Sequence, residues 1–204
     1  MKRLFTGIGI TAGILAIIGG IAYYWMAGRS PRETVKAEGG AKVHVEELSF
    51  YQGDTKVTGK VFRPVQDSSA RLSAVIYCQS REYGESWCRA LAGKGIIGYC
   101  FDFSGDTAAA RAETLRTVLG GMREQRHVAK DRIFVMGEGL GCLPAAELAV
   151  DKPKQVRGLI LVSPGFNPLE ISRKARRYRH SVLVVDDSLG RAANVEEVVG
   201  FILQ

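Results

Sequence analysis

The most constraining feature of this sequence is an apolar strand that runs without a spacer into a glycine turn and then a helix. Residues 133–136 (IFVM) are apolar, Gly137, Gly139 and Gly141 follow at alternate positions, and residues 142–150 (CLPAAELAV) have helical character. Glycines at this density permit a sharp backbone turn that side chains would hinder. The pattern predicts a strand–turn–helix unit of the kind found in α/β proteins.

The rest of the chain alternates between expected strands and expected helices. Two alternating runs, 43–50 and 56–63, predict an antiparallel hairpin. Further short apolar strands are expected at residues 73–77, 96–101, 158–162 and 182–185. A hairpin followed by alternating strands and helices predicts an α/β fold, a mostly parallel sheet with helices on both faces. Ligands of such sheets bind at the carboxyl ends of the strands, where the glycine turn is expected.

The N-terminus predicts a membrane anchor. Lys2 and Arg3 precede an uncharged apolar run, residues 4–27, which as a helix rising ~1.5 Å per residue crosses a ~30 Å hydrocarbon core. We expect a single transmembrane helix, a signal anchor, within residues 1–28, a polar linker over 29–42, and one domain over 43–204. A cleaved signal peptide is the alternative.

The charges that flank the apolar run are nearly balanced, so they decide the orientation only weakly. The short basic N-terminus favours an exported, periplasmic or extracellular domain, and the cytoplasmic orientation stays open. A net charge of +7 suits an anionic surface, and the chain carries no motif typical of nucleic-acid binding. We expect no nucleic acid, cofactor or metal.

Four cysteines, Cys78, Cys88, Cys100 and Cys142, show no C-x-x-C spacing, which disfavours a zinc site. Two interpretations remain. Either the four cysteines are small buried apolar residues, or they pair as disulfides outside the cytosol.

Three phrases occur in an order that resembles the bacterial α/β-hydrolase family, in its group of small esterases and serine-aminopeptidase-like enzymes. They are LAGKGIIGYCFDFSGD (91–106), DRIFVMGEGLG (131–141) and VRGLILVSPGFN (156–167). The resemblance implies an α/β-hydrolase-like sheet in which the second phrase is the nucleophile elbow, G-x-S-x-G. In this chain Gly139 stands where the family has its serine.

The resemblance therefore implies an active site that is incomplete. Glycine has no side chain to attack a carbonyl. One oxyanion donor, the amide of Leu140, is retained, whereas the loop expected to supply the second reads CQSR (78–81) in place of the usual His-Gly. We expect Leu140, Gln79 and Ser80 to be ligand-binding residues beside a degenerate elbow, with Glu138 supporting the structure.

The acid and the base are also in question. The acid falls on DDS (186–188), in which Asp187 is the candidate vestigial acid. The histidines, His44, His127 and His180, are expected in the hairpin or at the amino ends of parallel strands, too far from the elbow for proton transfer. The family's last strand and histidine loop are not found, so we expect a fold shortened at the C-terminus.

Three other features compete for a role. Cys142 is a candidate substitute nucleophile, because a helix N-terminus lowers a thiol pKa. Ser104 and Asp106 follow an expected strand at the carboxyl edge, where they could bind a ligand. The basic segment RKARRYRH (173–180) is a solvated helix or a site for anionic lipid, at Arg173, Lys174, Arg176, Arg177 and Arg179.

The sequence thus predicts a membrane-anchored α/β-hydrolase-fold pseudoenzyme that binds or scaffolds, with a protein partner or a small acyl-type ligand. The alternative is an active esterase, thioesterase or peptidase-like enzyme of the serine-hydrolase family, with a non-standard nucleophile or residues supplied by a partner. A degenerate remnant is the third possibility.

Overall fold

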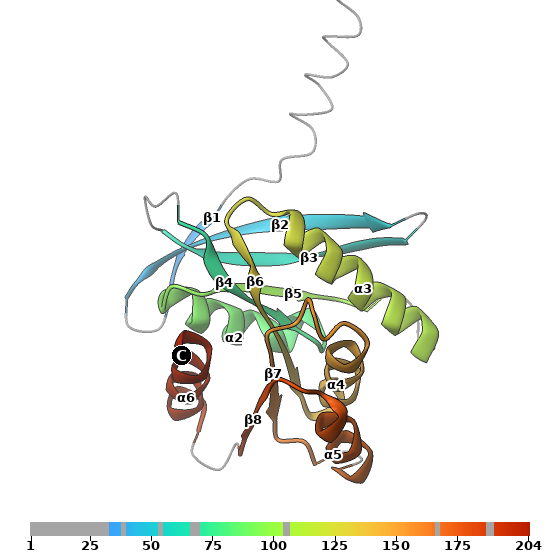
Figure 1. Cartoon of the computed structure of the whole chain (residues 1–204). Coiled ribbons are helices and arrows are strands. Elements are labelled where there is room, and N and C mark those ends of the chain that lie inside the picture. The colour runs from blue at the N-terminus through green and yellow to red at the C-terminus, as the bar shows by residue number, and fades with distance from the viewer. Residues whose placement is uncertain are drawn as a thin grey trace, which may run out of the picture. The chain divides into compact units, whose positions relative to one another are not determined.

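The computed structural model describes residues 33–37, 40–52, 55–65, 70–103, 107–165, 168–186 and 190–204. Strands and helices alternate along most of this span (Figure 1). The strands are β1 (Glu33–Lys36), β2 (Lys42–Gln52), β3 (Thr55–Pro64), β4 (Leu72–Tyr77), β5 (Ile97–Phe101), β6 (Val128–Glu138), β7 (Gly158–Val162) and β8 (Ser181–Val185). The helices are α2 (Arg81–Gly93), α3 (Ala108–Glu124), the 3-10 turn η1 (Gly139–Gly141), α4 (Cys142–Asp151), α5 (Pro168–Arg177) and α6 (Arg191–Leu203).

The eight strands form one mixed sheet in the order β1-β2-β3-β5-β4-β6-β7-β8. Strands β4 to β8 are parallel to one another, whereas β1, β2 and β3 join through antiparallel pairings. The five parallel strands therefore end at the same edge of the sheet. This arrangement confirms the predicted α/β class, the hairpin and the mostly parallel sheet.

Helices cover both faces of the sheet, and each face has its own core (Figure 1). Helices α3, α4 and α5 pack on one face, where Leu115, Val118, Leu119 and Met122 of α3 are buried. Helices α2 and α6 pack on the other, where Trp87 of α2 is 1% exposed. The helical faces expected from apolar spacing are the faces that are buried.

The expected linker is wrong over part of its length. Residues 33–36 form β1, which pairs antiparallel with β2 from Glu33 opposite Val45 to Lys36 opposite Lys42. The segment ETVK has exposed charged ends, so its sequence lacks the apolar alternation that marks a half-buried strand. The pairing with β2, not its own side chains, makes it a strand.

The predicted anchor at residues 4–27 lies outside the described residues. Of the helices that the structure describes, none is both long and apolar enough to cross a membrane. The candidate site residues Ser104, Asp106 and Asp187 also lie outside the described residues.

Candidate functional site

The glycine turn after β6 has the backbone geometry of a nucleophile elbow. Strand β6 ends at Glu138, the turn η1 follows at once, and α4 begins at Cys142. Gly139, at the centre of the turn, has φ +51°. This left-handed conformation costs a residue with a side chain ~1–3 kcal/mol, and glycine adopts it freely.

The two flanking glycines are required by packing, and the central one is not. A Cβ on Gly137 would lie 2.3 Å from the Gly141 carbonyl oxygen, and a Cβ on Gly141 would lie 1.9 Å from the Cys78 carbonyl oxygen. Both distances are far below van der Waals contact. A Cβ on Gly139 would meet no heavy atom within 4 Å. Position 139 therefore projects into open space at the carboxyl edge, as a nucleophile would have to.

The loop after β4 lies directly against this elbow. The Cys78 amide donates to the Met136 carbonyl at 2.7 Å, and a Cβ on Gly141 would come within 3.1 Å of the Gln79 Cβ. The hydroxyl of Ser80 is buried and has no hydrogen-bond partner among the described residues. The structure thus brings Gln79 to the elbow, with Ser80 next to it in the same loop.

Leu140, the remaining predicted oxyanion residue, directly follows the elbow centre. Its amide lies in the first turn of the 3-10 segment, where backbone N–H groups lack intrahelical acceptors. Its side chain is 62% exposed. Leu140 therefore lies at the position that the resemblance assigns to one oxyanion donor.

Glu138 is tied into the protein by a network that sequence reasoning missed. Its Oε2 accepts hydrogen bonds from the Tyr77 hydroxyl at 2.5 Å and from the Trp87 indole N–H at 3.0 Å. Burial and this carboxylate raise the pKa of Tyr77 far above its ordinary value. Arg191 of α6 lies over the Trp87 ring, 5.8 Å from its centre. The network joins β4, β6, α2 and α6 beneath the elbow, which supports a structural role for Glu138.

Nothing in the local sequence around Glu138 signals these partners, because Tyr77 and Trp87 are 61 and 51 residues away along the chain. The sheet order places Tyr77 of β4 beside β6, and the packing of α2 on the sheet brings Trp87 to the same carboxylate.

The geometry argues against Cys142 as a nucleophile. Its side chain is fully buried, and its thiol lies 3.3 Å from the Gly137 carbonyl oxygen and 3.4 Å from that of Val162. Burial raises the pKa of the Cys142 thiol to about 12, opposite to the lowering expected at a helix N-terminus. A protonated thiol facing the sheet cannot attack a ligand above it.

All four cysteines are buried and free, which confirms their interpretation as small core residues in the reduced chain. No group of three or more histidine, cysteine or acidic side chains able to hold a metal occurs among the described residues.

The histidines lie away from the elbow, as expected. His127 immediately precedes β6, of which the regular stretch from Ile133 to Glu138 alone spans roughly 17 Å at ~3.3 Å per residue. His180 precedes β8, a five-residue strand, and His44 lies in β2 with its Nδ1 3.1 Å from the Thr34 hydroxyl. General base catalysis requires ~3 Å or one bridging water.

A hollow of about 530 Å³ lies at the carboxyl ends of β7 and β8. Ser163 follows β7 with φ +45°, an uncommon conformation for a residue with a side chain, and its amide donates to the Val185 carbonyl at 3.0 Å. The hollow is lined by Ser163, Pro164, Gly165, Val184, Val185 and Asp186. It lies at the edge where α/β folds bind ligands, beside the predicted acid loop.

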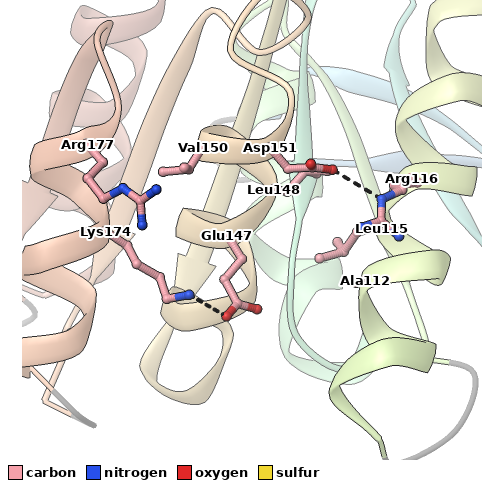
Figure 2. Close-up of a pocket in the computed structure, with 9 residues that line it drawn as sticks. All are labelled: Ala112, Leu115, Arg116, Glu147, Leu148, Val150, Asp151, Lys174 and Arg177. Carbon is pink, nitrogen blue, oxygen red and sulfur yellow. Dashed lines mark hydrogen bonds and ion pairs between the residues drawn. The ribbon is translucent and has the colours of Figure 1, made fainter.

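A second hollow, a groove of about 490 Å³, lies between α3, α4 and α5 (Figure 2). Two ion pairs cross it. The Lys174 Nζ lies 2.7 Å from the Glu147 Oε1, and the Arg116 Nε lies 3.1 Å from the Asp151 Oδ2 (Figure 2). Arg177 also lines the groove, from α5. Lys174, one of the residues predicted to bind lipid, therefore braces α5 against α4.

The other predicted lipid contacts are exposed: Arg173, Arg176, Arg177 and Arg179. The basic segment thus divides into one bracing lysine and four arginines at the surface.

The sequence matches no protein-family model and no curated protein. Solved structures do resemble this chain. Fungal esterase structures from Rhizomucor miehei match with a TM-score of 0.63 at 10% identity, over 89% of this chain and 87% of theirs. An esterase from the archaeon Pyrobaculum calidifontis matches with a TM-score of 0.52 at 23% identity, over 58% of this chain and 43% of that enzyme.

A thermostable carboxylesterase from a metagenomic library matches with a TM-score of 0.51 at 20% identity, over 58% of this chain and 46% of the enzyme. The chain thus spans less than half the length of these last two esterases. At such identities the likeness shows the fold alone. The chain has an α/β-hydrolase fold.

Proposed function

We propose that this chain is a membrane-anchored pseudohydrolase, an α/β-hydrolase-fold protein that binds or scaffolds and does not catalyse hydrolysis. The observation that carries the proposal is Gly139. Its φ of +51° and its open Cβ direction are those of a nucleophile position, but it has no atom that can attack.

The surroundings of Gly139 support the proposal. An activated nucleophile needs a base within hydrogen-bond reach, and the described histidines lie at or near the opposite edge of the sheet or in the hairpin. Cys142, the nearest alternative nucleophile, is buried with a raised pKa. These facts weigh against an active enzyme with a non-standard nucleophile.

Several groups at the same edge favour a bound ligand. The Leu140 amide, the Gln79 side chain and the buried Ser80 hydroxyl lie around the elbow, and the hollow beside Ser163 adjoins it in the sheet order. We propose that this edge receives a small acyl-type ligand, or the side chain of a protein partner, without turnover.

The membrane part of the proposal rests on the sequence. Residues 4–27 would anchor the chain, with the domain exported, and the exposed arginines of the segment 173–180 would face anionic lipid. Vesicle co-sedimentation of the full chain with Arg173→Glu/Arg177→Glu tests the second contact, because the double variant should keep its anchor but lose binding that depends on anionic lipid and falls with salt.

The deciding experiment is hydrolysis of p-nitrophenyl acetate and butyrate by the full chain in detergent, beside its Cys142→Ala and Gly139→Ser variants. We expect no rate above buffer for any of the three, because serine alone would lack a base. Folding of each variant is checked by its unfolding transition. A wild-type rate that Cys142→Ala abolishes would refute the pseudohydrolase and support the enzyme.

A further inference from the structure

The sheet sorts the four cysteines into two pairs. Cys88 and Cys100 belong to the core on the face covered by α2 and α6, whereas Cys78 and Cys142 belong to the core on the face covered by α3, α4 and α5. All four side chains are fully buried. Because the sheet lies between the two cores, a cysteine of one core cannot bond to a cysteine of the other. The fold therefore permits two disulfides at most, Cys88–Cys100 and Cys78–Cys142.

Cys88 and Cys100 face each other where helix α2 packs on strand β5. Their side chains are hydrogen-bonded to each other. A glycine lies opposite each cysteine. A Cβ on Gly98 of β5 would lie 2.6 Å from the Cys88 Cβ and 2.9 Å from its sulfur, and a Cβ on Gly84 of α2 would lie 2.6 Å from the Cys100 Cβ. These distances are below van der Waals contact, so the two glycines let the helix approach the strand closely enough for the sulfurs to meet.

Cys78 and Cys142 make contacts of another kind. The Cys78 thiol donates to the Ile76 carbonyl at 3.7 Å. The Cys142 thiol lies 3.3 Å from the Gly137 carbonyl oxygen and 3.4 Å from that of Val162. Within the described part of the chain, each thiol of this pair thus has backbone carbonyls as acceptors rather than its partner's sulfur. The contacts favour bonding in the first pair and not in the second.

We propose that Cys88 and Cys100 form a structural disulfide between α2 and β5 when the chain folds in the presence of a low-molecular-weight disulfide. One thiolate of the pair attacks this oxidant, which releases one thiol and leaves a mixed disulfide on the protein. The other thiolate then attacks the protein sulfur of the mixed disulfide and releases the second thiol. The protein loses two protons and two electrons, and the oxidant gains them.

Burial decides when this bond can form. Burial, and after it the hydrogen bond with Cys100, raise the pKa of Cys88 well above its ordinary value. The folded chain therefore holds Cys88 as a thiol, whereas the thiolate is the attacking species. Since Cys100 is fully buried as well, the pair reacts while the chain folds and is protected from reduction afterwards. The bond is thus a permanent part of the fold rather than a redox switch.

The bond would fix the helix that supports the elbow. Trp87, next to Cys88 in α2, donates to the Glu138 carboxylate at 3.0 Å, and the loop that carries Gln79 and Ser80 leads into the same helix. In the cell the bond depends on the proposed exported location, because disulfides persist in oxidising compartments. Refolding in a defined redox buffer tests the pairing without reference to location or catalysis.

The first test is the thiol pairing of the full chain, refolded in detergent from denaturant with reduced and oxidised glutathione. Free thiols are blocked with N-ethylmaleimide, and the unreduced protein is digested with trypsin. Cleavage after lysine and arginine places the four cysteines in four different peptides, 72–81, 82–89, 95–111 and 133–154. Mass spectrometry should show peptides 82–89 and 95–111 joined, with two hydrogens fewer than their sum. The other two peptides should each carry one blocking group.

The second test is thermal stability with and without the bond. Closing the short loop between residues 88 and 100 should raise the Tm by roughly 5–12 °C in a domain of this size. The oxidised wild type should show this rise over the same protein after reduction, and so should Cys78→Ala, the matched control. Cys100→Ala should have the same Tm in both conditions. Because each variant is compared with itself, any loss of stability from the substitution cancels.

Three results would overturn the proposal. They are four blocked thiols after oxidative refolding, a link between peptides 72–81 and 133–154 in place of the expected one, and a rise in Tm on oxidation that persists in Cys100→Ala. None of these results depends on whether the elbow is catalytic or on which side of a membrane the domain lies. The disulfide and the pseudohydrolase can therefore fail separately.

Discussion

Replacing Gly139 with alanine isolates the backbone free energy of the elbow. The new Cβ meets no heavy atom within 4 Å, so neither packing nor a clash contributes. What remains is the left-handed conformation at φ +51°, which costs a residue with a Cβ ~1–2 kcal/mol. Alanine is preferred to serine for this purpose because it adds no hydrogen bond.

The matched control is Gly120→Ala. Gly120 is exposed in α3, and its Cβ would also meet nothing within 4 Å, but its φ is not positive. Both substitutions raise the free energy of unfolding by ~0.4–1 kcal/mol, because alanine restricts the conformations of the unfolded chain. Gly139→Ala should therefore destabilise by about 0.8 kcal/mol (roughly 1.5 less 0.7). Gly120→Ala should stabilise by ~0.5–1 kcal/mol.

The assay is denaturant unfolding of the full chain in detergent, followed by tryptophan fluorescence and repeated as a thermal scan. At ~2–4 °C per kcal/mol for a domain of this size, the two variants should differ in Tm by roughly 2–8 °C, with Gly139→Ala the lower. Equal stability of the two variants would refute a left-handed residue at position 139, and with it the elbow on which the pseudohydrolase proposal depends.

Three further predictions follow from the same packing. Gly121→Ala should destabilise by ~1–3 kcal/mol, because its Cβ would lie 2.1 Å from the Phe50 ring. In denaturant unfolding its change in the free energy of unfolding should therefore have the opposite sign to that of Gly120→Ala. Glu138→Leu should cost ~2–4 kcal/mol in the same assay and Glu138→Gln clearly less, because leucine removes the acceptor of the Trp87 N–H and the closer acceptor of the Tyr77 hydroxyl, which keeps only Gln79 Oε1 at 3.4 Å. Cys142, with a pKa of about 12, should resist iodoacetamide at pH 8 in native protein and react once unfolded, as mass spectrometry would show. Because its folded pKa lies above the unfolded value of ~8.5, its contribution to stability is complete below that pH and is lost as pH rises toward 12.

Much of the fold could be predicted because its signals are local. Apolar runs of four to six residues marked the parallel strands, and each glycine-rich break marked a turn. Strand β1 could not be predicted, since ETVK has the composition of a loop and becomes a strand only by pairing with β2. The start of β6 was missed for a similar reason. The first five residues of β6, from Val128, include the charged residues 130–132. The apolar pattern of the strand therefore begins only at Ile133.

The candidate site, too, could be predicted only where its signals are local in the sequence. The elbow could be predicted because its three glycines stand at every second position directly after an apolar strand. The network around Glu138 was not, since its donors come from β4 and α2 and meet only when the sheet is assembled. The burial of Cys142 was partly predictable. A helix N-terminus lowers a thiol pKa, but desolvation outweighs that effect here, because the thiol is buried against two backbone carbonyls.

The elbow also shows why its motif reports the fold more strongly than the chemistry. Gly137 and Gly141 are fixed by backbone atoms of α4 and of the loop after β4, so any side chain there would separate the helix from the sheet. Gly139 is under no such constraint, because its Cβ direction is empty and only its φ is unusual. A chain can therefore exchange serine for glycine at the centre, relieve the strain and keep the turn, but it cannot exchange either flanking glycine. On this reasoning G-x-G-x-G after a buried strand predicts the same strand–turn–helix unit as G-x-S-x-G does, whereas catalysis requires both a nucleophile at the central position and a base within reach of it.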